Sequence, residues 1–455
     1  MMSQLQQTVA IAGGGLAGLA AGCALADVGY RVQLFERRPY LGGRASSYQH
    51  PGTGEVVDNC QHVLLGCCTN LLDLYKRSGV LEQVRWFENL NFMEPGGRRS
   101  IIGPSFLPEP LHTSWSFLTA RALSLEDKTG VARAMLSLLR DIPDDGRPFL
   151  DWLRAHGQTQ RAIDRFWNVV LVSALNEDLD RVSTHYAALV FRESFLKSRE
   201  AGRMGIPAVP LTDLYSAAGR YIEQRGGEVN LRASVESFKA DDNGVKLCVG
   251  GNELLADFAV LALPFNTLQQ VLPEDEKARP LRGMLERFES SPITGIHLWF
   301  DRKVTELDHA VLLDRTIQWM FNKSRLQGRN DEGSYLELVV SSSKTLVDKS
   351  RQEIVDLAIR ELSEFFPEVL KATLVKSTVI KEIHATYSPK PGIDEYRPGA
   401  RSDWARVFLA GDWTATGWPA TMEGAVRGGY LAAEAVAGKK FLIADLPARG
   451  LMRIF

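Results

Sequence analysis

The sequence predicts an α/β protein in which a Rossmann-type dinucleotide-binding domain is interleaved with a second domain of mixed sheet and helices. Three observations predict this fold. A G-x-G-x-x-G motif at residues 13–18 lies between an apolar strand and a helix. Near the other end of the chain, an apolar strand ends at Gly411 and Asp412, shortly before another helix. Between these two segments, amphipathic helices are followed by apolar strands, so the chain leaves the dinucleotide domain and later returns to it.

The N-terminal motif has the residues that a bound pyrophosphate requires. Gly13 permits the tight turn after the strand, Gly15 lets the backbone approach the pyrophosphate, and Gly18 lets the helix pack closely on the strand. The N-terminus of the helix offers free N–H groups and the positive end of its dipole to the phosphates. Glu36 ends the second strand, at the distance from the motif where an acid that hydrogen-bonds ribose hydroxyls belongs.

A second glycine-rich cluster identifies the dinucleotide. Gly42, Gly43 and Arg44 follow the acid within a few residues. This cluster resembles the second glycine–arginine motif of flavoprotein amine oxidases and phytoene-type desaturases, in which the arginine contacts the FAD diphosphate. The resemblance implies that the cofactor is FAD rather than NAD and that the first domain is a Rossmann-type FAD-binding domain.

The composition excludes several other classes of protein. Among 455 residues, 53 basic and 55 acidic side chains give a net charge of −2, which indicates no nucleic-acid-binding surface. We see no signal peptide and no uninterrupted apolar run of about 18 residues, so we expect no membrane-spanning segment. The five cysteines show neither Cys-x-x-Cys nor Cys/His metal spacing. We therefore expect reduced thiols, no metal centre and a cytoplasmic location.

A polar cluster follows the first motif, where a short apolar strand ends at Val57. Asp58, Gln61 and His62 belong to this cluster and can project into one site. A polar loop that ties together a sheet edge is one interpretation. A catalytic group is the other, and the position of the cluster favours it, because related flavoproteins bring this part of the chain past the isoalloxazine. We therefore name Asp58, Gln61 and His62 as the candidate catalytic residues.

The next part of the chain is expected to be largely helical. Periodic apolar positions, a capping box at Ser124 and glycine stops predict helices at residues 69–78, 115–139, 149–157 and 163–174, with a hairpin at residues 91–102. The apolar faces of these helices either form a core or line a tunnel for a long apolar substrate. Sequence patterns are the same for the two cases, so both interpretations stay open.

The middle of the chain is expected to return to the FAD-binding domain. Within residues 206–225, a Pro-rich entry leads into a helix that contains Leu211, Leu214, Ala218 and Tyr221. Strands follow at residues 228–231, 234–238 and 245–249, and the apolar strand at residues 258–264 is expected to be buried on both faces. The same flavoproteins place the backbone of a residue matching Val235 against adenine. Strands at residues 295–300 and 335–340 and a helix at residues 347–366 then predict more of the second domain.

The C-terminal segment is the second strong motif. A buried strand ends at Gly411 and Asp412, and a helix is expected to begin near Pro419 or Ala420. In this flavoprotein class, Asp412 would bond the ribityl chain of FAD. The N-terminus of the helix near Met422 would face the flavin O2, where negative charge develops on reduction. Two segments from opposite ends of the chain thus converge on one cofactor.

The expected division of the chain has five segments. Residues 1–80, 205–287 and 399–455 form the FAD-binding domain, and residues 81–204 and 288–398 form the substrate domain. The residues expected to bind FAD come from all three parts of the first domain. They are Gly13, Gly15, Leu16, Ala17, Gly18, Glu36, Arg37, Gly43, Arg44, Val235, Gly411, Asp412, Thr421 and Met422.

Nearly the whole chain resembles the hydroxysqualene dehydroxylases, the squalene-associated FAD-dependent desaturases of bacterial hopanoid pathways. The most specific shared features are the polar cluster at residues 58–66, the segment at residues 298–302, and the C-terminal residues 410–414 and 419–424. The resemblance implies removal of the hydroxyl of hydroxysqualene to give squalene, with reduced FAD as the hydride donor. His62 or Asp58 would donate a proton to the leaving oxygen or stabilise the allylic cation. Asp58 is expected to be a neutral acid in an apolar pocket.

Other functions remain open at this stage. A carotenoid (phytoene-type) desaturase would run the opposite redox reaction on an apolar substrate, a flavin amine oxidase would act on amines, and a flavin-stabilised scaffold would not react at all. The expected partners are an apolar substrate of the squalene type, an unidentified electron donor and neighbouring squalene-pathway enzymes. Peripheral contact with the inner face of the cytoplasmic membrane is also expected, through the basic and apolar tail at residues 439–443 and 450–455.

Overall fold

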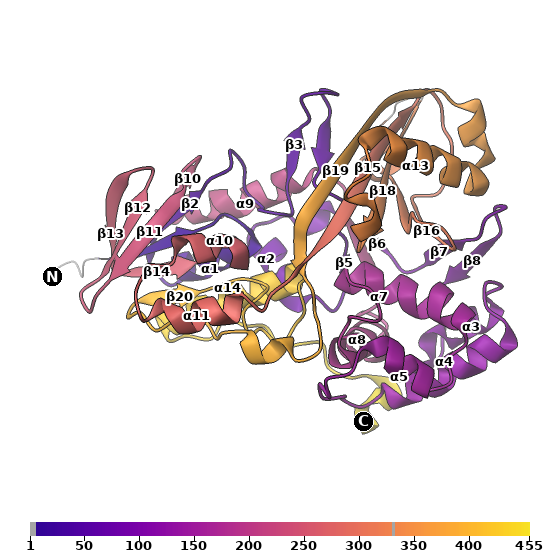
Figure 1. Cartoon of the computed structure of the whole chain (residues 1–455), viewed down its shortest axis with the longest axis horizontal. Helices are drawn as coiled ribbons and strands as arrows, with labels where there is room; N and C mark the ends of the chain where they lie inside the picture. Colours follow the sequence, from indigo (N-terminus) through magenta and orange to yellow (C-terminus); the bar gives the residue numbers. More distant parts are fainter. Residues whose placement is uncertain (1–5, 330–332) are drawn as a thin grey trace.

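The computed structural model describes residues 6–329 and 333–455. A five-stranded parallel sheet forms the centre of the FAD-binding half of the molecule (Figure 1). Its strands, in spatial order, are β10 (Glu228–Leu231), β2 (Arg31–Glu36), β1 (Thr8–Ala12), β14 (Phe258–Leu261) and β20 (Val407–Leu409). The sheet therefore joins segments from the beginning, the middle and the end of the sequence, as the two glycine motifs predict.

Two helices from opposite ends of the chain pack together on this sheet. They are α1 (Leu16–Asp27) and α14 (Met422–Ala437). Both are rich in alanine and glycine, which allows their backbones to approach closely. A Cβ atom added at Gly429 of α14 would lie 2.2 Å from the Ala17 carbonyl oxygen of α1. Because α1 and α14 also follow the two glycine motifs, this packing brings the N-terminal and C-terminal motifs side by side.

A seven-stranded mixed sheet forms the second half of the molecule (Figure 1). Its strands, in spatial order, are β19 (Leu374–Tyr387), β15 (Ser290–Phe300), β18 (Ser334–Ser341), β17 (Trp319–Asn322), β16 (His309–Leu312), β7 (Leu90–Met93) and β8 (Arg99–Ile102). Strands β16 and β7 are parallel and the other neighbours are antiparallel. Helix α13 (Arg351–Phe365) covers one face, where Ile354 and Leu362 pack against Leu298 and Leu338.

Smaller elements complete the two halves. Short sheets are formed by β3 (Ser47–Gln49) with β4 (Val56–Asp58), by β5 (Leu64–Leu65), β9 (Met204–Pro207) and β6 (Val84–Phe87), and by β11 (Val235–Ala240), β12 (Val245–Val249) and β13 (Asn252–Ala256). The remaining helices of the FAD-binding half are α2 (Thr69–Arg77), α9 (Leu211–Glu223), α10 (Phe265–Val271) and α11 (Ala278–Leu285). In the other half, α12 (Lys323–Leu326) follows β17.

A group of helices lies below the mixed sheet in Figure 1, at the end of the molecule that also carries the C-terminus. Its members are α3 (Ser114–Thr119), α4 (Leu125–Ser137), α5 (Phe149–Ala155), α6 (Gln160–Ala162), α7 (Asn168–Leu175) and α8 (Thr184–Phe191). A π-helical turn, η3 (Ile163–Trp167), joins α6 to α7, and a second one, η4 (Arg192–Leu196), extends α8. Trp167 and Phe191 are buried in the core of this group.

The predicted fold class is confirmed, with three local differences. The helix predicted at residues 115–139 is two helices, α3 and α4, and the capping box at Ser124 starts only the second. Helix α13 begins at Arg351, because Ser350 caps it through its own capping box. Strand β19, with fourteen residues, was not predicted. The five segment boundaries stay a prediction. Among the residues that the structure describes, no helix is long and apolar enough to cross a bilayer.

Candidate active site

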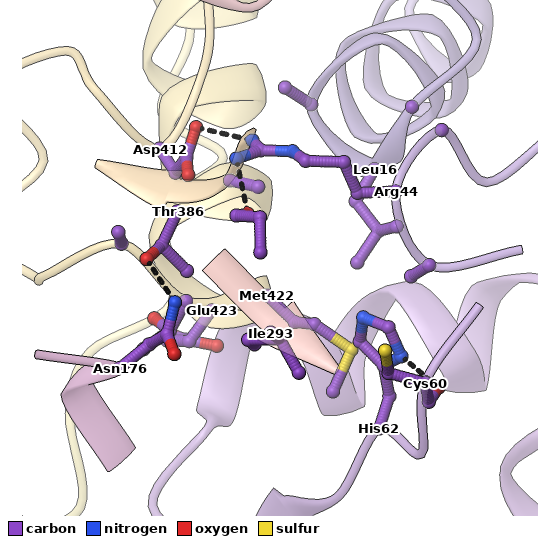
Figure 2. A pocket seen from close by; sticks show the side chains of 18 of the residues that line it. Leu16, Arg44, Cys60, His62, Asn176, Ile293, Thr386, Asp412, Met422 and Glu423 are labelled. Carbon is purple, nitrogen blue, oxygen red and sulfur yellow. Dashed lines mark hydrogen bonds and ion pairs between the residues drawn. The ribbon is translucent and has the colours of Figure 1, made fainter. Parts of the chain in front are cut away.

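A single cavity of about 700 Å³ joins the two halves of the molecule. One end is lined by the glycine motif after β1, the second glycine cluster and the N-terminus of α14. The other end is lined by the mixed sheet and the helices of the substrate half. Figure 2 shows side chains from both ends converging on this space. Segments far apart in sequence therefore share one site.

The glycine motif leaves room for a ligand at the start of α1. A Cβ atom added at Gly15 would lie 3.9 Å from its nearest neighbour, the Gly43 Cα, so the backbone here borders open space. A Cβ atom at Gly18 would lie 1.9 Å from the Gly13 carbonyl oxygen. Gly18 therefore lies against the turn and not in the cavity, as the close packing of helix and strand requires. These glycines fit a pyrophosphate at the N-terminus of α1.

Glu36 is buried at the end of β2, beside the glycine motif. Its carboxylate accepts hydrogen bonds from the Gly14 and Arg38 backbone N–H groups, each at 2.8 Å. Each carboxylate oxygen can accept more than one hydrogen bond, so ribose hydroxyls can also be bound. Glu36 and Arg37 both line the cavity. The acid thus orders the glycine turn, and from the cavity wall it would hold the ribose hydroxyls.

We expect the Glu36→Gln variant to bind FAD at least about tenfold more weakly, because hydrogen bonds to a charged group contribute roughly 1.5–3 kcal/mol. The amide keeps the shape of the side chain and removes its charge. Titration of the apoprotein with FAD, followed by flavin fluorescence, measures the affinity. Glu228→Gln on the neighbouring strand β10 is the matched control, since Glu228 does not line the cavity. Equal affinities for the two variants would contradict the role given to Glu36.

Arg44 and Asp412 connect the two glycine-containing segments. The Arg44 guanidinium donates to Asp412 at 2.8 Å and to the Ala385 carbonyl oxygen of β19 at 2.8 Å (Figure 2). The Asp412 carboxylate raises the pKa of Arg44, although burial opposes that shift. Both residues line the cavity. Arg44 would hold the diphosphate and Asp412 the ribityl chain, and their ion pair fixes the distance between these two positions.

The N-terminus of α14 points into the same cavity. The helix begins at Met422, later than the start at Pro419 or Ala420 that the sequence predicts, because the Thr421 hydroxyl caps it by accepting from the Gly424 N–H at 3.0 Å. Figure 2 shows the Met422 side chain directed toward His62 and Cys60. The positive end of the helix dipole therefore faces the cavity, where it would stabilise the negative charge that develops on a bound flavin when it is reduced.

Arg397 is a structural residue of this motif that sequence reasoning missed. It is buried, and its guanidinium donates to the Asp412 carbonyl oxygen at 3.0 Å and to the Thr416 hydroxyl at 2.9 Å. These bonds shape the loop between β20 and α14. The residues around Arg397 form a proline-rich loop and show no pattern that predicts a buried arginine. Its position shortly before the Gly411–Asp412 motif was the one available signal.

The other end of the cavity is mainly apolar, with Ser173, Asn176, Glu193 and Ser194 among its polar lining residues. Its walls come from strands and helices of the substrate half, including the π-helical turn η4. Representative residues are Leu90, Phe92, Val170, Leu189, Met204 and Ile293. The predicted amphipathic helices contribute both to a core, through Trp167 and Leu171, and to the cavity wall, through Val169 and Val170. That the cavity is a tunnel for a long apolar substrate stays a prediction.

His62 lies in the cavity wall as a neutral imidazole. Its Nδ1 is 2.9 Å from the Cys60 carbonyl oxygen, and a carbonyl only accepts, so Nδ1 carries the proton. Burial lowers the pKa of His62 below its usual value. At neutral pH, Nε2 therefore holds a lone pair. Cys60 supports this arrangement with a left-handed backbone conformation, φ 63°. His62 is a proton donor only in its minor, protonated form.

Asp58 does not have the role expected from the sequence. It lies behind the cavity wall and forms an ion pair with Lys323, whose Nζ is 2.6 Å from Asp58 Oδ2. Ser47 Oγ and the Leu211 N–H donate to the other carboxylate oxygen. Burial raises the pKa of Asp58, but Lys323 and these hydrogen bonds outweigh it, and the pKa is lowered. Asp58 is thus an ionised structural group and not a neutral acid.

Gln61 lines the cavity, and hydrogen bonds to Lys323 and to the backbone of His62 fix its side-chain amide. Its Oε1 accepts from Lys323 Nζ at 2.8 Å, and its Nε2 donates to the His62 carbonyl oxygen at 3.0 Å. Both ends of the amide are thereby used to fix the turn that carries His62. Lys323 was missed by sequence reasoning, because it lies more than 260 residues from Asp58 and Gln61.

The predicted site residues therefore fall into two groups. Asp58 and Gly18 lie outside the cavity, in the packing behind it. The others line the cavity: Gly13, Gly15, Leu16, Ala17, Glu36, Arg37, Gly43, Arg44, Gln61, His62, Val235, Gly411, Asp412, Thr421 and Met422. Their placement fits a dinucleotide that extends from β11 to the N-terminus of α14. Their individual contacts with a cofactor stay predictions.

Comparison with known proteins assigns the family. Residues 16–437 match the family of flavin-containing amine oxidoreductases. The chain is 30% identical to a 15-cis-phytoene desaturase of Synechococcus elongatus, over 95% of this chain and 96% of that protein. It is 27% identical to a probable zeta-carotene desaturase of the same organism, over 94% and 98% of the two chains.

A solved structure of putrescine oxidase shows the same fold, with a TM-score of 0.73 at 17% identity, over 96% of this chain and 100% of the other. An oxidoreductase from Methanosarcina mazei is equally similar in structure, with a TM-score of 0.73 at 17% identity, over 95% and 100% of the two chains. The residues around the cavity fit the cofactor of this fold. The chain therefore belongs to the flavin-containing amine oxidoreductase family, and it is an oxidoreductase whose cofactor is FAD.

Proposed function

We propose that the protein removes the hydroxyl group of hydroxysqualene by FAD-dependent reduction and so forms squalene. The carbon that carries the hydroxyl gains a hydride, and the oxygen gains a proton and leaves as water. One observation supports this proposal most strongly. The cavity has long apolar walls and an imidazole, His62, where these walls meet the FAD-binding end.

The apolar walls suit a long isoprenoid chain. Residues from β7, α7, α8, β9 and β15 surround this end of the cavity and offer few hydrogen-bonding groups. Burial of hydrocarbon against such walls is favourable by roughly 25 cal/mol per Å² of apolar surface. A substrate with a single polar group would therefore be oriented by that group, and His62 lies where such a group would be needed.

The presence of His62 favours an alcohol over a pure hydrocarbon. A hydrocarbon offers no hydrogen bond to Nε2, whereas a hydroxyl group can donate to it or, when the ring is protonated, accept from it. The protonated ring would assist departure of the oxygen as a general acid. Bound FAD supplies the hydride. The apolar walls exclude water from the allylic cation that loss of the hydroxyl leaves, so the cation is not quenched by hydroxide.

The proposed reaction requires a reductant from outside the protein. Each conversion of the alcohol to squalene consumes two electrons, and no group among the described residues replaces them. We propose an external electron donor that restores the reduced cofactor after each turnover. Enzymes that make hydroxysqualene or consume squalene would be its neighbours in the reaction sequence.

A carotenoid-type desaturase is the second candidate, and the relatives favour it. The phytoene desaturase that is 30% identical to this chain matches it over nearly its whole length. Such a reaction would remove hydrogen from the substrate, and the neutral Nε2 of His62 could accept the proton. The likeness to putrescine oxidase, at 17% identity, shows the fold alone and does not favour an amine as substrate.

Product analysis under opposite redox conditions tests the proposal. In one arm, the photoreduced holoenzyme is incubated with hydroxysqualene without oxygen, and we expect squalene in an amount equal to the enzyme. In the other arm, the oxidised holoenzyme is incubated with 15-cis-phytoene, and we expect no desaturated product. Desaturation of phytoene together with unchanged hydroxysqualene would replace the proposed function by the second candidate.

A further inference from the structure

Large apolar side chains are exposed at the end of the molecule that carries the C-terminus. Phe106 is 93% exposed and Ile454 is 77% exposed, and both lie outside the hydrophobic cores. We define the docking surface by six exposed residues: Phe106, Trp115, Leu118, Leu451, Ile454 and Phe455. Several large exposed apolar side chains in two neighbouring segments mark an interaction site more often than a scatter of single apolar residues does.

Hydrogen bonds hold the two segments of this surface together. The Leu451 N–H donates to the Glu109 carbonyl oxygen at 2.8 Å, which joins the C-terminal turn to the loop that carries Phe106. Ser105 Oγ donates to the His112 carbonyl oxygen at 2.8 Å and closes that loop directly before α3. Trp115 and Leu118 then lie on one face of α3, because they are three residues apart.

The charges around the surface are mainly positive. Glu109 is the only acidic residue between positions 98 and 125, and residues 449–455 contain none. Arg121, Arg449 and Arg453 in these segments are all exposed, and of these Arg449 pairs with Glu200 at 3.8 Å. Apolar residues with flanking arginines match the chemistry of an anionic lipid surface, whose headgroups attract cations while the acyl region takes up apolar side chains.

The docking surface is also continuous with the walls of the cavity. Phe117 of α3 packs edge-on against Phe166, with ring centroids 5.3 Å apart, and Phe166 precedes α7, which lines the cavity. On the other side, the Arg449 N–H donates to the Lys197 carbonyl oxygen at 2.9 Å, next to the cavity-lining turn η4. Both segments of the surface thus rest on elements that line the apolar end of the cavity.

We propose that this surface docks the protein on an anionic lipid bilayer, as a peripheral protein at the inner face of the cytoplasmic membrane. The reason for docking rests on the proposed function, because a squalene-like substrate dissolves in the bilayer and must pass from it into the cavity. The docking itself depends only on the exposed side chains and the flanking charges.

The C-terminal tail contributes only in part. Residues 450–455 belong to the docking surface, as the sequence predicts for this end of the tail. Residues 439–443 do not: Phe441 is buried, its N–H donates to Glu434, and the Ile443 N–H donates to Asn70 Oδ1 at 2.8 Å. That part of the tail packs on the FAD-binding half of the molecule. The loop with Phe106 and helix α3 supply the rest of the docking surface.

Vesicle flotation of the full-length holoenzyme tests the inference. The vesicles contain phosphatidylcholine alone or with phosphatidylglycerol. We expect flotation with the anionic vesicles, and at least tenfold weaker binding for the triple variant Phe106→Ser, Trp115→Ser, Leu118→Ser. The matched controls are Leu255→Ser and Leu370→Ser, which are 72% and 74% exposed elsewhere. Their binding should equal that of the unchanged protein.

Two further measurements distinguish the possible failures. Turnover of detergent-solubilised substrate should be unchanged in the triple variant, because none of its three positions lines the cavity. If the unchanged protein floats with anionic vesicles but converts no hydroxysqualene, the result counts against the proposed function and not against docking. Equal flotation of the triple variant and the controls would overturn the docking surface. A change from dimer to monomer in the triple variant, without a change in flotation, would assign the surface to a second copy of the chain.

Discussion

Replacing Lys323 by methionine is expected to lower the free energy of unfolding by about 3–5 kcal/mol, because it leaves an uncompensated charge in the protein interior. Lys323 Nζ lies 2.6 Å from Asp58 Oδ2 and 3.5 Å from Glu337 Oε2, and all three side chains are buried. Without the ammonium group, Asp58 would keep a negative charge without a cation. Glu337 is less affected, since burial raises its pKa to about 8 and it is neutral at pH 7.

Urea unfolding at pH 7, followed by circular dichroism, measures this effect. The control is Lys376→Met, which removes an exposed ion pair with Glu55 and should cost less than about 1 kcal/mol. The double variant Asp58→Asn, Lys323→Met should recover part of the loss, because it removes both charges. If Lys323→Met destabilises the protein no more than Lys376→Met does, the buried ion pair does not stabilise the junction between the two halves.

Replacing His62 by alanine is expected to slow product formation by roughly a hundredfold or more, as loss of general acid catalysis typically does. His62 is the imidazole that lines the cavity where its apolar walls meet the FAD-binding end. FAD binding should survive, because the hydrogen bond that the His62 side chain makes among the described residues goes to the Cys60 carbonyl oxygen and not to a predicted FAD-binding residue. Single-turnover measurements under anaerobic conditions give the rate, and His156→Ala, at the exposed C-cap that follows α5, is the matched control.

The pH dependence of this rate tests the same assignment without a mutation. Dehydroxylation needs the protonated ring, and burial lowers the pKa of His62 below its usual value. The protonated fraction therefore falls about tenfold per pH unit above that pKa, and the rate should rise as the pH is lowered. Desaturation would need the neutral ring and would show the opposite slope. A rate that rises with pH, or one that His62→Ala leaves unchanged, would contradict the role of His62 as the acid.

Local patterns predict the FAD-binding end of the site well. The turn from β1 to α1, and Glu36 at the end of β2, depend on residues that are close in sequence, so spacing alone places them. The predicted start of α14 is a few residues too early. Pro419 and Thr421 both favour the start of a helix, and the hydrogen bond from the Gly424 N–H to the Thr421 hydroxyl sets it at Met422.

Contacts between distant segments were not predictable from the sequence. Lys323 determines the protonation state of Asp58 from more than 260 residues away, so a carboxyl expected to be neutral is ionised. The tautomer of His62 likewise depends on the carbonyl oxygen of Cys60, and the sequence carries no local signal for the left-handed conformation of that residue. The division of a buried apolar helix into core and cavity wall follows from tertiary packing as well.

Single-turnover spectroscopy shows whether the protein reduces an oxygenated isoprenoid. Photoreduced holoenzyme is mixed with hydroxysqualene without oxygen, and the flavin absorbance is recorded while squalene is measured in quenched samples. The account predicts that the oxidised-flavin absorbance returns in step with squalene, with one squalene formed per flavin oxidised. A flavin that stays reduced in the presence of hydroxysqualene, in an enzyme whose oxidised form dehydrogenates 15-cis-phytoene, would contradict it.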